Sequence, residues 1–103
     1  MVLDSLALSS SNDSRALAVS VLKASSLAAN TPARALRGRE GLAILHCSAC
    51  PAILIECGYL SHKSDALRAP QERWQNQLAL GIAEGVEVWG TTARDGVVAG
   101  SPR

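Results

Sequence analysis

The chain has 103 residues, of which 48% are hydrophobic and 3% aromatic, and its formal net charge is +1. This length allows one domain at most, and a near-neutral charge without blocks of either sign argues against a nucleic-acid partner. No apolar run approaches the ~20 residues that a membrane span needs, and the first residues lack the basic region of a signal peptide.

The first predicted element is a helix that begins near Asp13 or Ser14, since either residue can cap it. Apolar residues then recur at helical spacing and would form one face of the helix: Leu17, Val21, Ala24 and Ala28. Pro32 would end this helix, because the residue before a proline avoids the helical region. The arginine-containing stretch at residues 31–41 is interpreted as a solvated loop.

Two apolar runs, residues 42–45 and 52–57, are predicted to be strands. The connection between them, residues 46–51, is too short for a parallel crossover, so the strands would be antiparallel neighbours or not adjacent. Glu56 would lie at the carboxyl end of the second strand, the edge where ligand crevices form in open α/β sheets. A carboxylate there is costly unless it is paired, bound to a metal or open to a cleft.

A second helix is predicted after a loop and a short turn, because Pro70 suits the first helical position. Apolar residues spaced by four form its predicted stripe: Trp74, Leu78, Ile82 and Val86. Gly81 and Gly85 each weaken a helix by roughly 1 kcal/mol, which is tolerable where the helix packs closely on a neighbour. Gly90 is predicted to end the helix, and residues 91–103 are predicted to form a disordered tail.

These elements follow one another in the order helix, strand, strand, helix. Two helices cannot cover both faces of two buried strands, nor can they satisfy the outer edges of those strands. The predicted fold class is therefore α/β, with a partial mixed sheet flanked by helices that forms part of a larger sheet.

The cysteines lie close together in the sequence, at Cys47, Cys50 and Cys57, and their odd number argues against a closed disulfide framework. His46 precedes the CxxC spacing, which suits either a dithiol or half of a zinc site. Only Cys57 and His62 follow, so a second metal-binding pair is missing. We interpret the cysteines as small residues beside a strand, and a small thiol or metal protein is the alternative.

A longer pattern points to a known family. PAILIECGYLS at residues 51–61 is followed by Asp65, a leucine-bearing turn and ALGIAEGVEVW at residues 79–89. This pattern resembles the C-terminal half of the zinc-dependent N-acetylmuramoyl-L-alanine amidases, in which proline and several aliphatic residues precede Glu-x-Gly-Phe/Tyr-aliphatic-Ser-Asn. The resemblance covers roughly residues 12–89 and implies a partial amidase-like catalytic domain over residues 1–90.

The resemblance implies a hydrolase that cuts the amide between the lactyl group of N-acetylmuramic acid and the first L-Ala of the peptidoglycan stem peptide. In that family zinc polarises the carbonyl and activates a water. Glu56 matches the catalytic acid/base of the family, a role that suits a carboxylate at a strand end. The family acts in the bacterial cell envelope or outside the cell, so the implied partner is peptidoglycan.

The zinc ligands of the family, two His and a Glu, belong to motifs that precede the helix near Asp13, and those motifs are absent here. No metal ligand is therefore assigned in this chain, which is expected to be inactive alone and to need a missing N-terminal half or a partner chain. His62 stands where the family usually has Asn, and we interpret it as a loop histidine.

The sequence also allows an alternative function for the chain and an alternative role for Glu56. The chain could be a non-catalytic binding or assembly module that keeps this half of the fold. Glu56 could also be a structural carboxylate paired with an arginine such as Arg37 or Arg39.

Overall fold

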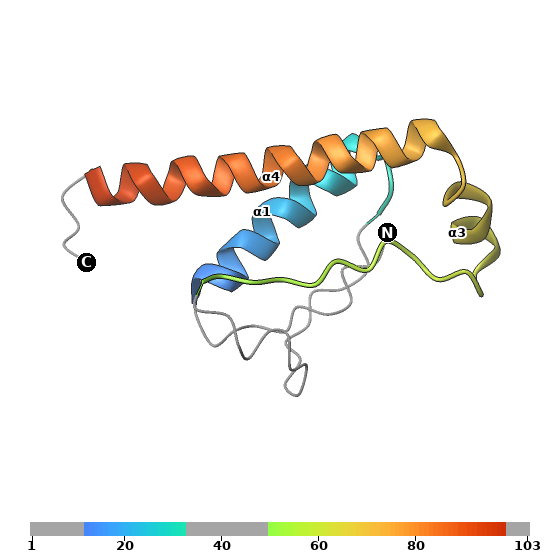
Figure 1. Ribbon diagram of the computed structural model, residues 1–103, viewed down its shortest axis with the longest axis horizontal. Helices are drawn as coiled ribbons and strands as arrows, with labels where there is room; N and C mark the ends of the chain where they lie inside the picture. The colour runs from blue at the N-terminus through green and yellow to red at the C-terminus, as the bar shows by residue number, and fades with distance from the viewer. Residues whose placement is uncertain (1–11, 33–49, 99–103) are drawn as a thin grey trace.

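The computed structural model describes residues 12–32 and 50–98 (Figure 1). The described part contains the helices α1 (Asn12–Ala28), α3 (Lys63–Arg68) and α4 (Glu72–Val98). Helix α4 is the long helix of the structure, and α1 crosses it obliquely in Figure 1. Residues 50–59 form a largely extended stretch, here called the Glu56 segment, which runs beside α1 and leads through a turn into α3. Within the described residues, no helix is both long and apolar enough to cross a membrane.

Helix α1 begins slightly before the predicted start, and Ser14 lies inside it rather than at its cap. The Ser14 side chain is fully buried, and its Oγ accepts a hydrogen bond from the Ala52 N–H at 3.0 Å. A serine inside a helix can use its hydroxyl for a contact outside the helix, and here it ties α1 to the Glu56 segment.

The end of α1 lies where Pro32 predicts it. Asn30 has a φ of 48°, and its N–H donates to the Leu27 carbonyl at 3.2 Å, while the Thr31 N–H donates to the Ser26 carbonyl at 3.0 Å. This pair of bonds around a left-handed residue is the Schellman motif, which satisfies carbonyls that the last helical turn leaves free.

The crossing of α1 and α4 is close because glycines of α4 lie on it. A Cβ atom added to Gly81 would lie 2.6 Å from Ser25 Cα, and one added to Gly85 would lie 2.5 Å from Val21 Cα. The hydroxyl of Ser20 donates to the Gly85 carbonyl at 2.6 Å across the same crossing. The prediction that both glycines serve close packing on a neighbour is confirmed, and α1 is that neighbour.

The core lies near the start of α4, where Trp74 and Leu78 are buried with Ala29. Leu22, Ile55 and Ile82 pack against this cluster. The predicted stripe is wrong at Val86, which is 45% exposed. Residues spaced by four drift by about 40° per step around a helix, so the fourth member lies about 120° from the first.

The predicted α/β class, a partial mixed sheet flanked by helices, is wrong for the described residues, which are mostly helical and contain no sheet. Residues 52–57 are extended, yet Glu56 alone among them forms an isolated bridge. An extended run becomes a strand only where another extended backbone pairs with it, and the neighbours described here are helices, which bond internally. The predicted first strand, residues 42–45, lies outside the described residues.

Helix α4 also runs past its predicted end. It continues through Gly90 to Val98, so residues 91–98 are helical where a tail was predicted. A glycine ends a helix when the chain turns left-handed there. Inside a helix it costs only about 1 kcal/mol relative to alanine, which the helix on either side can tolerate.

Candidate functional site

The candidate site centres on Glu56, near the end of the Glu56 segment. Ile55 packs on the core cluster, which anchors the backbone immediately before it. Glu56 itself is half-buried, and the Tyr59 hydroxyl donates a hydrogen bond to its Oε2 at 3.2 Å. Between described residues the structure records no ion pair at Glu56. A partly accessible carboxylate held by a neutral donor can take up or release a proton.

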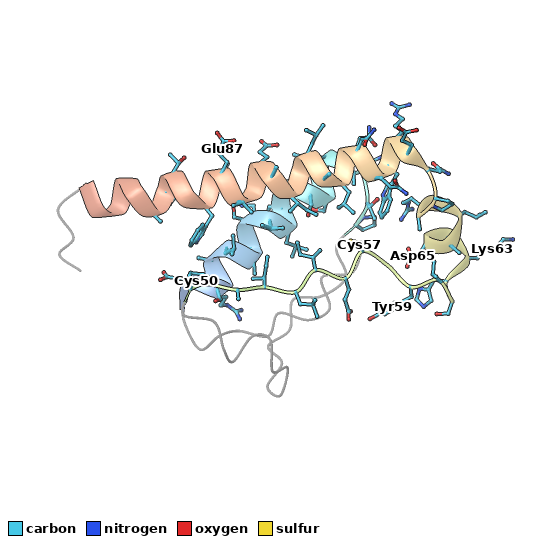
Figure 2. The ribbon with its side chains drawn as sticks, viewed as in Figure 1. Cys50, Cys57, Tyr59, Lys63, Asp65 and Glu87 are labelled. Carbon is cyan, nitrogen blue, oxygen red and sulfur yellow. The ribbon has the colours of Figure 1, made fainter. Side chains whose placement is uncertain are left out.

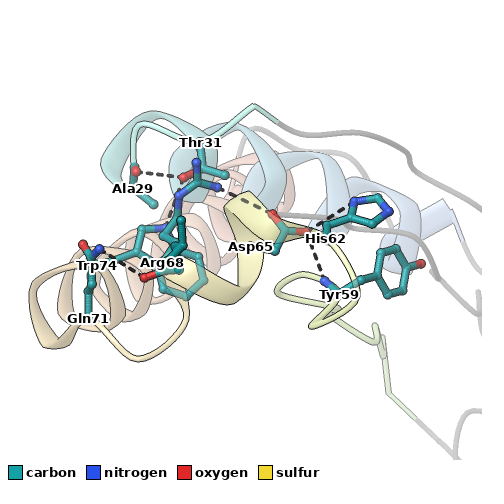
Figure 3. Close-up of polar contacts among 9 residues, drawn as sticks. Ala29, Thr31, Tyr59, His62, Asp65, Arg68, Gln71 and Trp74 are labelled. Atoms are coloured by element: carbon teal, nitrogen blue, oxygen red, sulfur yellow. Dashed lines mark hydrogen bonds and ion pairs between the residues drawn. The ribbon is translucent and has the colours of Figure 1, made fainter.

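The turn that follows Glu56 closes on Asp65. Gly58 has a φ of 147°, a conformation that favours glycine, and a Cβ there would lie 3.1 Å from Asp65 Cγ. The Tyr59 N–H donates to Asp65 Oδ2 at 3.1 Å (Figure 3). The Gly58–Asp65 turn (residues 58–65) is therefore built on contacts between the Asp65 carboxylate and the backbone near Glu56.

Asp65 is itself buried, with 5% of its surface exposed, and the side chains of Arg68 and His62 lie on two sides of its carboxylate. Arg68 Nη1 lies 3.7 Å from Oδ1, and His62 Nδ1 lies 3.8 Å from Oδ2 (Figure 3). A buried carboxylate is costly unless hydrogen bonds and charges compensate it, and the Tyr59 N–H and Arg68 both do so. The sequence analysis included Asp65 only as one position of the family motif and missed this structural role.

His62 lies at the N-terminal end of α3 as an exposed loop residue, as predicted. Its ring meets the Tyr59 ring edge-on, with centroids 5.6 Å apart. Among the side chains that the structure describes, in residues 13–32 and 50–93, no three of His, Cys, Asp or Glu gather closely enough to hold a metal ion. The described residues therefore do not fit the zinc that the resemblance implies, and zinc dependence stays a prediction.

Two of the three cysteines, Cys50 and Cys57, lie in the described part of the chain. Cys50 and Cys57 are both exposed, and Figure 2 shows them at separate points of the Glu56 segment. Although Cys57 is exposed as a residue, the protein around its sulfur shields it partly from water, and this desolvation raises the pKa of the thiol. A raised pKa disfavours the reactive thiolate. His46 and Cys47 lie outside the described residues, as do Arg37 and Arg39, the ion-pair partners considered for Glu56.

A cavity of about 630 Å³ lies away from Glu56, between the first half of α1 and the later part of α4. Arg15, Val19 and Lys23 line it from α1, and Val88 and Trp89 line it from α4. No residue of the Glu56 segment contributes to its walls, so this cavity is not part of the candidate site.

Comparison with known proteins gives one finding. A family model described as N-acetylmuramoyl-L-alanine amidase matches residues 5–88. The matched region contains α1, the Glu56 segment, the Gly58–Asp65 turn and most of α4. No curated protein and no solved structure was found to match the chain.

Proposed function

This chain belongs to the N-acetylmuramoyl-L-alanine amidase family, and we propose that Glu56 is the proton-transferring carboxylate of a peptidoglycan amidase. The reaction is hydrolysis of the amide that joins the lactyl group of N-acetylmuramic acid to the first L-Ala of the stem peptide. The family membership indicates an amidase, and the assignment of Glu56 within it is our proposal.

The observation that carries this proposal is the setting of Glu56. The carboxylate is half-buried, it accepts a hydrogen bond from the neutral Tyr59 hydroxyl, and no ion pair is recorded for it among the described residues. A structural carboxylate would instead be expected to face a cation. The setting supports a group that remains free to exchange a proton with water or substrate.

Amide hydrolysis needs two proton movements that one carboxylate can perform. An attacking water loses a proton as its oxygen bonds to the carbonyl carbon, and the amide nitrogen gains a proton as the C–N bond breaks. Glu56 would accept the first proton and deliver it to the departing nitrogen, so the carboxylate returns to its starting state. The Tyr59 hydrogen bond occupies Oε2, which leaves Oε1 for the transfer.

The described residues offer no metal site. We propose that the zinc ligands typical of the family come from its N-terminal half, here called the zinc-bearing half, and that the chain alone is inactive. The bacterial cell wall is the proposed place of action.

The proposal is tested by supplying the zinc-bearing half of a family amidase, fused upstream of this chain, and incubating the fusion with cell-wall sacculi. Mass spectrometry should find stem peptides with a free amino group on L-Ala and glycan strands with a free lactyl carboxylate. A fusion that folds and binds zinc yet releases no stem peptide, or one that cuts another bond, would show that the assignment is wrong.

A further inference from the structure

We propose that Asp65 is a positioning residue, which acts on the Glu56 carboxylate through Tyr59. This inference rests on the proposed function and adds a residue that positions the catalytic carboxylate of the same site. The relay consists of Asp65, Tyr59 and Glu56, joined by two hydrogen bonds that the structure records in sequence.

The first link of the relay fixes the Tyr59 backbone. The Asp65 Oδ2 atom accepts the Tyr59 N–H at 3.1 Å, and Asp65 is buried, so its carboxylate has little room to move. Arg68 Nη1, 3.7 Å from Oδ1, holds the other oxygen. Gly58 lies against the same carboxylate with a positive φ, which only a glycine adopts readily. On the other side of Tyr59, the His62 N–H donates to the Tyr59 carbonyl at 3.0 Å, so the Tyr59 backbone is held on both sides.

The second link carries that placement to the reacting group. Once its backbone is held, the Tyr59 side chain has two rotatable bonds, and the edge-on contact with the His62 ring restricts them further. The hydroxyl then lies 3.2 Å from Glu56 Oε2 and orients the carboxylate. A side chain free in solution would sample several rotamers, whereas proton transfer needs one geometry.

A relay of this kind differs from a merely structural role in how its parts combine. If Asp65 acts only by placing the Tyr59 hydroxyl, then removing the hydroxyl leaves Asp65 with nothing to place. Asp65→Ala and Tyr59→Phe should then be non-additive in their effect on kcat, because both remove one interaction, whereas Asn at position 65 would keep an oxygen acceptor for the Tyr59 N–H. If the two substitutions caused independent structural defects, their fold-losses in kcat would multiply instead.

The experiment measures kcat and KM for the fusion with the zinc-bearing half, using a soluble muramyl peptide. Tyr59→Phe should lower kcat roughly 10- to 100-fold, the range for loss of a hydrogen bond to a charged group, with KM changed little. Asp65→Ala should lower kcat similarly, and the kcat of the double variant should fall no more than about twofold below that of the less active single variant. Glu87→Gln, which alters an exposed carboxylate on α4 (Figure 2), is the matched control and should leave kcat unchanged.

An independent readout needs no activity. In the chain alone, the ¹³Cδ resonance of Glu56 should shift in Tyr59→Phe, and Asp65→Ala should shift it in the same direction, while Glu87→Gln should not. Equal kcat in Tyr59→Phe and parent, or a Glu56 resonance that is unchanged by Asp65→Ala, would overturn the relay. An unchanged kcat in Tyr59→Phe combined with a large loss in Glu56→Gln would reject the relay and leave the proposed function standing.

Discussion

Replacement of Gly81 by alanine tests the close crossing of α1 and α4. The new Cβ would lie 2.6 Å from Ser25 Cα, 2.9 Å from Ala28 Cβ and 3.0 Å from the Ala24 carbonyl oxygen. Ordinary contacts between carbon atoms lie at about 3.5–4.0 Å. Two of the three atoms belong to the α1 backbone and the third is a Cβ fixed to it, so α1 must move by roughly 1 Å to relieve the contact.

The expected cost follows from two opposing effects. Overpacking of this kind costs about 1–3 kcal/mol. The alanine also favours the helix by up to about 1 kcal/mol relative to glycine. The free energy of unfolding should therefore fall by anything from nearly nothing to about 2 kcal/mol.

Gly90 provides the matched control in the same helix. A Cβ there would meet nothing within 4 Å, so Gly90→Ala should raise the free energy of unfolding by about 1 kcal/mol through helix propensity alone. Urea unfolding followed by circular dichroism measures both variants against the parent. If Gly81→Ala stabilises the chain as much as Gly90→Ala does, the close crossing is refuted.

Three further predictions concern the core, the thiols and the isolated chain. Leu78→Ala should lower the free energy of unfolding by about 2–5 kcal/mol because Leu78 is buried in the core, and an unchanged urea midpoint would mean that α4 is not docked. Cys57 should react slowly with iodoacetamide at neutral pH, and the midpoint of the rate against pH should lie above the usual thiol pKa because desolvation raises the pKa of Cys57. A midpoint near neutral pH would favour the thiol interpretation. The chain alone, incubated with zinc and sacculi, should release no stem peptides, and chelator-sensitive release would reveal a ligand set among its own residues.

The helices were largely predictable because their signals are local. The spacing of Trp74, Leu78 and Ile82 gives the buried side of α4, and Pro32 gives the end of α1. The use of Gly81 and Gly85 for close packing could be inferred because glycines weaken a helix and need a compensating contact.

The predicted sheet failed for a reason that local patterns cannot reveal. Residues 52–57 carry the composition of a buried strand, but strand formation depends on a pairing partner elsewhere in the chain. The described neighbours of this segment are α1 and α4, and Ile55 packs on them without a ladder. The apolar run thus predicted extension correctly, but the predicted burial is wrong, since none of residues 52–57 is buried and Leu54 is exposed, and the predicted pairing is wrong as well.

The candidate site could be predicted in part. Glu56 stands out as a carboxylate in an apolar run, and its motif carried the family resemblance that the family match confirms. The contact from Tyr59 and the burial of Asp65 were missed, since Asp65 entered the sequence analysis only as part of the family motif. The sequence did carry a signal for the contact between Asp65 and the Tyr59 backbone. Gly58 is followed by an aspartate in the next turn, and aspartate often accepts backbone N–H groups near turns.

The most direct test of the central claim, proton transfer by Glu56, is the turnover of Glu56→Gln in the fusion with the zinc-bearing half. Gln keeps the shape and one oxygen acceptor but cannot exchange a proton at neutral pH. The account predicts a 10²–10⁴-fold loss of turnover on a muramyl peptide, the typical contribution of general acid–base catalysis, at normal zinc content and near-normal melting temperature. Turnover within about tenfold of the parent, well inside that catalytic contribution, would remove Glu56 from the mechanism.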